Sequence, residues 1–181
     1  IFSAVKRAFE RGQRAQLDRD VGQGSLLDLF GSEGREEATG RGIMYVLEEV
    51  LAGQGRSLKD VTVAFQGFGN VGSHGARLMA ERGAKIVAVG DHVGGVANQE
   101  GLDVLALCDW VAEHRSVAGF SGGDAFESSE VLTWNADVLI PAALGGVLTA
   151  ENAPDVRASV VIEAANGPTT PEADRHLAER G

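Results

Sequence analysis

Three glycines at positions 67, 69 and 72 have the spacing of a turn that holds a phosphate group. They follow the apolar residues 61–66, which are typical of a buried strand, and they open residues 70–82, which are typical of a helix. Gly67 permits a tight turn, Gly69 lets a pyrophosphate approach the backbone, and Gly72 lets the helix lie close to the strand. The spacing therefore predicts an anion site at this junction.

Context decides whether the motif is meaningful, because a chain with 25 glycines can produce the same spacing by chance, as a fortuitous turn. Here the amides of Asn70, Val71 and Gly72 would face the anion at the positive end of the helix dipole. An acidic residue, Asp91, follows about twenty residues later at the end of the next apolar segment. Strand, glycines, helix and acid together predict a dinucleotide-binding site.

The acid and its neighbour bear on which dinucleotide binds. Asp91 would accept hydrogen bonds from the adenosine ribose hydroxyls and would repel a 2′-phosphate, which favours NAD. His92 could instead help to hold a phosphate, so NADP stays open; a solvent-facing loop histidine is the alternative. A comparison of the dissociation constants of NADH and NADPH separates these cases.

The elements around the motif form a βαβ unit, in which the strand 61–66 and helix 70–82 lead to a second apolar strand, 84–89. Strands and helices alternate through the rest of the chain, which predicts an α/β fold: a doubly wound, Rossmann-like, mostly parallel sheet with helices on both faces. The further elements expected are helices at 36–51, 101–115 and 171–179, strands at 137–140 and 159–163, and a glycine-rich loop at 116–124.

The first thirty residues have a different character. Ile1, Phe2, Val5 and Phe9 recur at helical spacing, which predicts an N-terminal amphipathic helix. Glycine, aspartate and serine then surround a short apolar hook at 26–30, as at a linker. We therefore expect two regions: residues 1–31 as helix and linker, and residues 32–181 as the dinucleotide-binding domain.

Composition excludes several classes of function. Sixteen basic and 26 acidic residues give a net charge of -10, which disfavours nucleic acids and anionic membranes as partners. Cys108 is the only cysteine, so no intrachain disulfide forms and a cytoplasmic location is expected. No apolar run approaches the roughly 18 residues of a membrane span. The four histidines lack metal-ligand spacing, so no metal site is expected.

Four blocks in order, GREEATGRG (34–42), QGFGNVG (66–72), VLIPAAL (138–144) and EAANGPTTPEAD (163–174), resemble the glutamate dehydrogenase family of amino acid dehydrogenases. The resemblance runs from about residue 32 to the end and corresponds to the family's cofactor-binding domain. It implies a modified Rossmann fold with one strand reversed.

The resemblance also implies roles for individual residues. Thr39 would reach the nicotinamide carboxamide, although its hydroxyl could equally bond to its own helix backbone. Arg35 would lie on the substrate side. The expected cofactor-binding residues are Thr39, Gly67, Phe68, Gly69, Asn70, Val71, Gly72, Asp91, His92, Ala142 and Ala143 near the adenosine ribose, and Asn166 at the nicotinamide ribose. The family commonly has Glu-Asn after PAAL, where this chain has Gly145 and Gly146, so that loop is expected to be looser.

Catalytic residues are expected to lie outside this chain. In the family, an upstream domain supplies a lysine and an aspartate for proton transfer, and none of Lys6, Lys59 and Lys85 lies in a comparable loop. We therefore expect the chain to bind cofactor without turnover. Its parent protein, expected to be a homo-oligomer, would convert L-glutamate to 2-oxoglutarate and ammonia. The alternatives are a leucine, phenylalanine or valine dehydrogenase, and a free-standing dinucleotide-binding module or sensor.

Overall fold

The computed structural model describes residues 35–180, and side chains from Ala38 onward. The expected N-terminal helix, the apolar hook and the whole region of residues 1–31 lie outside the described residues. The elements of the sheet layer are β1 (Thr62–Gln66), β2 (Lys85–Gly90), β3 (Gly95–Ala97), β4 (Asp124–Phe126), β5 (Val138–Pro141) and β6 (Val160–Val161). The α-helices are α2 (Arg35–Gly53), α3 (Asn70–Glu81), α4 (Val104–His114) and α5 (Pro171–Glu179), and the 3-10 helices are η1 (Leu58–Asp60), η2 (Ser128–Thr133) and η3 (Ala153–Asp155).

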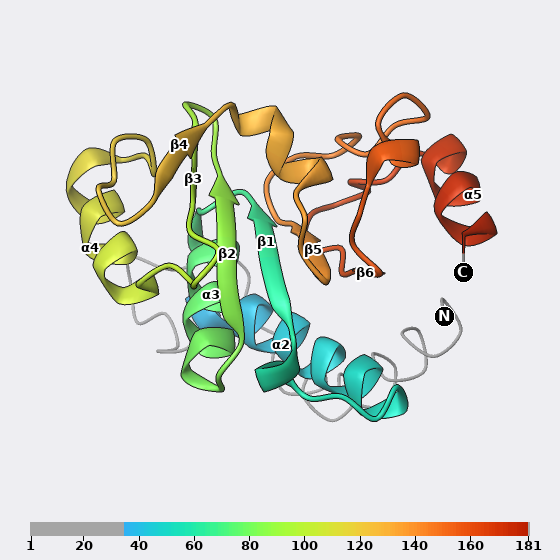
Figure 1. Cartoon of the computed structure of the whole chain (residues 1–181), viewed down its shortest axis with the longest axis horizontal. Coiled ribbons are helices and arrows are strands. Elements are labelled where there is room, and N and C mark those ends of the chain that lie inside the picture. The colour runs from blue at the N-terminus through green and yellow to red at the C-terminus, as the bar shows by residue number, and fades with distance from the viewer. Residues whose placement is uncertain (1–34, 181) are drawn as a thin grey trace.

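The six strands form one sheet in the order β4-β3-β2-β1-β5-β6 (Figure 1). β1 pairs in parallel with β2 and β5, and β5 pairs in parallel with β6. β3 is antiparallel to both of its neighbours, β2 and β4, so it alone runs against the other five strands. The predicted fold class is confirmed, including the one reversed strand that the family resemblance implied.

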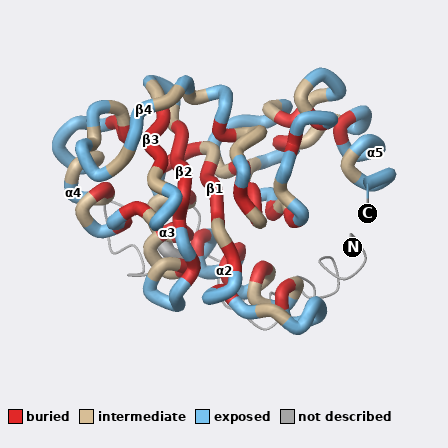
Figure 2. Tube along the Cα trace, in the orientation of Figure 1, coloured by how far each residue is buried: buried red, intermediate tan, exposed pale blue. Residues whose placement is uncertain are grey.

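Strand alternation sends side chains into two separate cores. Val63 and Phe65 of β1 join the cluster that contains Leu47 of α2 and Met79 of α3. Ala64, between them, joins the cluster on the other face. That second cluster also contains residues of η2, η3 and α5, namely Val131, Ala153 and Ala173. Both faces of the sheet are therefore covered, and Figure 2 shows β1 and β2 buried.

Helices α2 and α3 cross at a point where both carry glycine. A Cβ on Gly40 would lie 2.8 Å from the backbone nitrogen of Gly75 and 3.0 Å from the Cβ of His74. A Cβ on Gly75 would meet the Ile43 side chain at 3.0 Å. The missing side chains let the two backbones approach closely, which fixes the first half of α2 beside the first turns of α3.

Two helix boundaries show how local chemistry sets the element ends. The helix expected from residue 101 begins only after Asp103, because the Asp103 carboxylate accepts a hydrogen bond from the Ala106 amide at 3.0 Å. Thr170 caps α5 by accepting from the Ala173 amide at 3.3 Å, with Pro171 in the first turn. At the other end of α4, Arg115 has a left-handed conformation, with φ of 62°.

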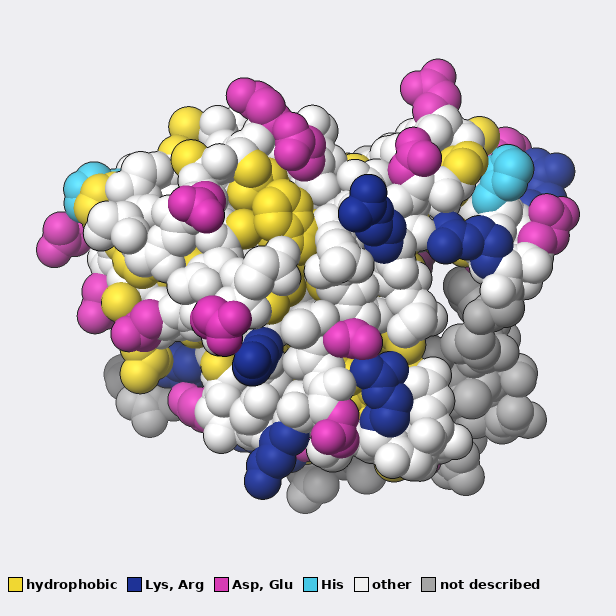
Figure 3. All heavy atoms as spheres, viewed as in Figure 1, with side chains coloured by type: hydrophobic (Ala, Val, Ile, Leu, Met, Phe, Trp, Pro, Cys, Tyr) yellow, Lys and Arg dark blue, Asp and Glu magenta, His cyan; other side chains and the backbone are white. Residues whose placement is uncertain are grey.

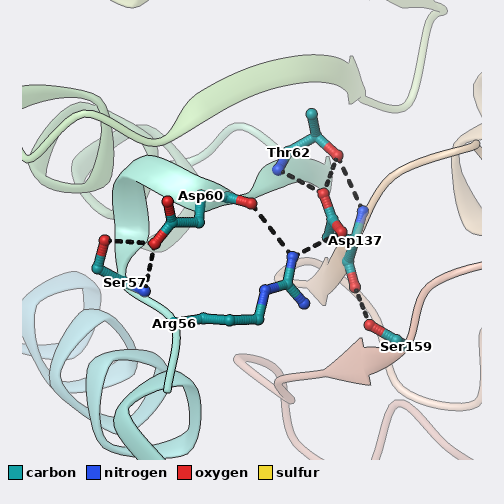
Figure 4. Close-up of polar contacts among 6 residues, drawn as sticks. All are labelled: Arg56, Ser57, Asp60, Thr62, Asp137 and Ser159. Atoms are coloured by element: carbon teal, nitrogen blue, oxygen red, sulfur yellow. Dashed lines mark hydrogen bonds and ion pairs between the residues drawn. The ribbon is translucent and has the colours of Figure 1, made fainter. Parts of the chain in front are cut away.

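The amino ends of three parallel strands are joined by one residue, Asp137, just before β5 (Figure 4). Its Oδ2 accepts from the amide and the hydroxyl of Thr62 at 2.8 and 2.7 Å, and its Oδ1 accepts from Arg56 at 2.8 Å. Its backbone carbonyl accepts from the amide of Ser159, just before β6, and from the amide of Val160, the first residue of β6. This network fixes the edge of the sheet opposite to the glycine turn.

The outer surface carries both signs of charge. On the face shown in Figure 3, Lys and Arg side chains lie singly among Asp and Glu side chains. None of the described helices is long and apolar enough to cross a membrane. Within residues 35–180, no group of three or more His, Cys, Asp or Glu side chains could hold a metal ion.

Candidate functional site

The glycine turn lies at the carboxyl end of β1, the central strand of the parallel part of the sheet. Gly67 has a φ of 100°, and its amide donates to the carbonyl of Gly90 at the end of β2 at 2.7 Å. A Cβ on Gly67 would lie 2.6 Å from the Cβ of Ala143. Gly67 is thus required both for its backbone conformation and for its contact with the loop after β5.

The other two glycines of the motif differ sharply in their surroundings. A Cβ on Gly72 would overlap the carbonyl oxygen of Gly67 and would lie 2.9 Å from its carbonyl carbon. A Cβ on Gly69 would meet nothing within 4 Å. Gly72 therefore serves the packing of α3 on the turn, whereas Gly69 borders open space at the start of α3.

The first turn of α3 keeps its amides available. Gly69 is the N-cap and offers no side-chain acceptor, and its carbonyl accepts from the Ser73 amide at 2.9 Å. Among the described residues, the amides of Asn70, Val71 and Gly72 have no hydrogen-bond acceptor. Three donors at the positive end of a helix dipole, beside a glycine with open space, form a local arrangement suited to an anion.

Two further loops approach the turn along the same edge. The Ala142 amide donates to the carbonyl of Gln66 at 2.6 Å, which fixes the loop after β5 beside the end of β1. The Gly146 amide donates to the carbonyl of Gly167 at 2.9 Å, and a Cβ on Gly145 would lie 2.9 Å from the carbonyl oxygen of Asn166. The structure thus brings the segments of Gly67, Ala143 and Asn166 together, and Asn166 itself is exposed.

Gly145 and Gly146 do not leave the loop without contacts. Gly146 has a φ of 66°, where glycine is favoured, and its amide is bonded to the neighbouring loop. Gly145 packs directly on the backbone of Asn166. The glycine pair therefore permits a close approach of two loops, which the sequence comparison with the family pattern did not anticipate.

Three further expected residues lie on α2 and in the glycine turn. Thr39 is exposed on α2, next to the Gly40 contact with α3, and its hydroxyl has no hydrogen bond among the described residues. Arg35 is the first residue of α2, and its side chain is not described. The Phe68 side chain is 5% exposed and belongs to the core, so only its backbone is available to a ligand.

Asp91 follows β2 directly, but its carboxylate is engaged inside the protein. Oδ1 accepts from the amides of Val93 and Gly94 at 2.8 and 3.2 Å and from the Ser116 hydroxyl at 3.1 Å. Oδ2 accepts from the Val117 amide at 2.7 Å. Partial burial raises the pKa of Asp91, yet these hydrogen bonds outweigh it and hold the pKa below its ordinary value. The carboxylate therefore stays ionised near neutral pH.

Ser116 and Val117 are the partners that the sequence did not reveal. They belong to a segment that looked like an ordinary glycine-rich loop, and they lie about 25 positions after Asp91 in the chain. Local sequence carries no signal for such a contact, apart from a serine directly after a helix end. His92, the other expected residue here, is exposed at the tip of the turn between β2 and β3.

Residues 31–181 match the model of the protein family described as Glutamate/Leucine/Phenylalanine/Valine dehydrogenase. One relative, the NADP-specific glutamate dehydrogenase A1 of Halobacterium salinarum, is 48% identical over 159 residues, which cover 87% of this chain and 38% of the relative. The chain therefore spans less than half the length of that relative.

Solved structures with the same fold are also glutamate dehydrogenases. The hetero-hexameric enzyme from Thermus thermophilus, in a Leu-bound form, matches with a TM-score of 0.78 and 34% identity, covering 88% of this chain and 37% of that one. The enzyme from Peptoniphilus asaccharolyticus matches with a TM-score of 0.70 and 34% identity, covering 88% of this chain and 36% of that one. Both matches leave most of the longer protein without a counterpart here.

Proposed function

Because the chain belongs to the glutamate, leucine, phenylalanine and valine dehydrogenase family, as an amino acid dehydrogenase domain, we propose that it binds a nicotinamide dinucleotide along the carboxyl edge of its sheet. The observation that carries this proposal is the open space at Gly69 beside the three amides of Asn70, Val71 and Gly72 that have no acceptor in the described chain. A diphosphate meets there the donors and the dipole that it requires.

The neighbouring residues suit the rest of the cofactor. Ala142 and Ala143 adjoin Gly67 and would pass the adenosine ribose, and the turn after β2 that contains Asp91 and His92 would border it. Asn166 lies on the adjacent loop, where its amide could bond to the nicotinamide ribose. These groups fit a dinucleotide laid across the edge.

The family resemblance assigns two residues of α2 to the nicotinamide end of the cofactor site. Thr39 has an exposed hydroxyl on α2 beside the start of α3, without a hydrogen bond in the described chain, which is compatible with a contact to the nicotinamide carboxamide. Arg35, one turn earlier on α2, would stand on the substrate side. When bound, the cofactor would supply the hydride acceptor, and this chain would supply its binding and orientation.

For the whole protein, we propose the oxidative deamination of L-glutamate to 2-oxoglutarate and ammonia, with water consumed and NAD(P)H formed. The Halobacterium salinarum relative carries this substrate in its name and is NADP-specific, so both NAD and NADP are retained for this chain. Lys59 and Lys85 lie at the amino edge of the sheet, before β1 and at the start of β2, far in the fold from the glycine turn. No lysine within the described residues 38–180 therefore lies at the turn, and we propose that residues outside this chain transfer protons to and from the substrate.

We also propose that the whole protein is an oligomer in the cytoplasm. The support is that the Thermus thermophilus neighbour is hetero-hexameric, although a homo-oligomer remains our expectation for this protein. The single cysteine, Cys108, and the net charge of -10 agree with a reducing, aqueous compartment.

A fluorescence titration of the purified 181-residue chain tests the proposal. We expect NADPH and NADH to bind with dissociation constants on the order of 1–100 µM, and we expect no glutamate-dependent reduction of either oxidised cofactor. Failure of both cofactors to bind at millimolar concentration would contradict the binding proposal. Measurable turnover would show that a catalytic group is present in this chain.

The identity of the amino acid substrate is tested with the whole protein rather than with this chain. The family includes leucine, phenylalanine and valine dehydrogenases, and side-chain selection is expected mainly outside the described residues. We expect kcat/KM for L-glutamate to exceed the values for L-leucine, L-phenylalanine and L-valine by at least about a hundredfold. A larger kcat/KM for one of the apolar amino acids would reassign the substrate.

The glycine pair after β5 provides a matched test of the loop contact. Gly145→Ala places a Cβ 2.9 Å from the backbone of Asn166, so the two loops must separate, and we expect affinity for both cofactors to fall roughly tenfold. Gly146→Asn has open space, and asparagine tolerates the left-handed φ of 66°, so affinity should stay unchanged. Equal titration curves for both variants would argue against a role of this contact.

A further inference from the structure

The carboxylate of Asp91 connects two segments that are distant in the chain. Two of its donors, the amides of Val93 and Gly94, belong to its own turn, and two, the Ser116 hydroxyl and the Val117 amide, follow helix α4. One side chain therefore joins the turn after β2 to the exit of α4.

Residues 115 and 116, at the exit of α4, position the donors that reach the carboxylate. Ser116 is only 8% exposed, and its hydroxyl both donates to Asp91 and accepts from the Ala118 amide at 3.0 Å. Directly before it, Arg115 is the only non-glycine residue with a positive φ in the described chain. A left-handed residue here costs free energy, and it turns the chain back so that residues 116 and 117 reach the carboxylate.

The backbone of Asp91 adds two more links. Its amide donates to the carbonyl of Gly94 at 2.8 Å, which closes the turn to β3. Its carbonyl accepts a hydrogen bond from the hydroxyl of Ser128, the first residue of η2. Asp91 thus ties together β2, the β2–β3 turn, the exit of α4 and the start of η2.

This bonding limits what the carboxylate can offer to a ligand. A carboxylate has about two acceptor positions on each oxygen; three donors of the protein share Oδ1, and one donor occupies Oδ2. At most one direction on Oδ2 stays open, which is too few for both hydroxyls of a ribose. Four donors around the charge also weaken its repulsion of a 2′-phosphate.

We propose that Asp91 is a positioning residue, which holds the two loops bordering the adenosine end of the cofactor site and does not discriminate against a 2′-phosphate by its charge. This proposal rests on the proposed cofactor binding. Loss of the Asp91 contacts therefore weakens NADH and NADPH binding together and leaves the ratio of their affinities nearly unchanged.

The test compares Asp91→Asn with Ser116→Ala in titrations of both cofactors. Asparagine keeps an acceptor for Oδ1 but places an amide donor against the Val117 amide and removes the charge. Ser116→Ala removes one partner of the carboxylate and retains the charge. We expect each variant to weaken both cofactors by roughly three- to tenfold, with the NADPH-to-NADH ratio constant within about twofold. The double variant should be less than additive.

The two variants would behave differently if Asp91 bound the cofactor directly or repelled a 2′-phosphate by its charge. Asp91→Asn would then shift the affinity ratio toward NADPH by tenfold or more, and Ser116→Ala would be silent; either outcome overturns the proposal. Asp124→Asn is the matched control, because it removes an exposed carboxylate of β4 that makes no hydrogen bond in the described chain. We expect this control to leave both affinities and their ratio unchanged.

Hydrogen exchange separates this proposal from the proposed function. In the wild-type chain without cofactor, the amides of Val93 and Val117 should exchange slowly, and in Asp91→Asn the Val117 amide should exchange at least tenfold faster. Fast exchange of both amides in the wild type overturns the positioning role even if cofactors bind. If the two amides exchange slowly but no cofactor binds, the proposed function is contradicted and the loop-holding role of Asp91 is supported.

Discussion

Alanine at position 72 is expected to destabilise the chain by about 3 kcal/mol, because the new Cβ would overlap the carbonyl oxygen of Gly67. The obstacle is backbone, so no side-chain rotation relieves it, and α3 must move away from β1. The free energy of unfolding measured by urea titration should fall by that amount. Cofactor affinity should fall by more than tenfold, since the amides of α3 move with the helix.

Alanine at position 69 is the matched comparison, with the same added methyl group in the same turn. Its Cβ would meet nothing within 4 Å, and the φ of -78° suits any residue, so stability should change by less than about 1 kcal/mol, the cost of a poorer helix cap. Binding should nevertheless fall by about tenfold or more, because the methyl group would occupy the space offered to the phosphate. Wild-type affinity in Gly69→Ala would mean that no phosphate lies against this residue.

The contrast between these glycines shows how much of the fold can be predicted from the sequence. The motif predicted β1, α3 and β2 within a few residues of their ends, because its glycines have local tasks that spacing reveals. β3 and β4 were missed, since each is three residues long and too short to show a period. The glycine-rich segment 116–124 gave no hint of its bonds to Asp91.

The same limit applies to the candidate site. Spacing located the turn and the family resemblance named the loops around it, but the contacts of Asp91 and Gly145 depend on which distant backbone each residue faces. Asp137 is the extreme case, because the sequence marks it only as the start of a strand. Its bonds to Thr62 span 75 positions, and no local pattern encodes a pairing between strand starts.

Asp137→Ala is therefore expected to have the second large effect, a loss of about 2–3 kcal/mol of unfolding free energy. The change removes three hydrogen bonds to a charged acceptor and leaves the Thr62 amide and Arg56 without it. The ion pair with Arg56 is about one-third exposed on both sides, at 31% and 35%, so solvent reduces its share. Most of the loss should come from Thr62.

Two variants apportion that loss. Thr62→Val removes the hydroxyl, which donates to Asp137 Oδ2 and accepts from the Asp137 amide at 2.9 Å, while preserving the shape of the residue. Arg56→Met removes the ion pair and keeps most of the side-chain length. In double-mutant cycles with Asp137→Ala, the coupling energy should be at least about 1 kcal/mol for Thr62 and less than that for Arg56. A larger coupling for Arg56 would contradict this division.

The hydrogen bonds of Asp137 also make the free energy of unfolding depend on pH. Partial burial raises the pKa of Asp137, but the hydrogen bonds from Thr62 and Arg56 outweigh it, so the folded pKa lies below the ordinary value of 3.8. The unfolded chain then binds the proton more readily, so the contribution is complete above about pH 5 and is lost as pH falls through 4 toward the folded pKa. Urea midpoints at pH 7, 5, 4 and 3 should fall less steeply in Asp137→Ala than in the wild type. Some slope should persist, because the hydrogen bonds of Asp91 lower its pKa in the same direction.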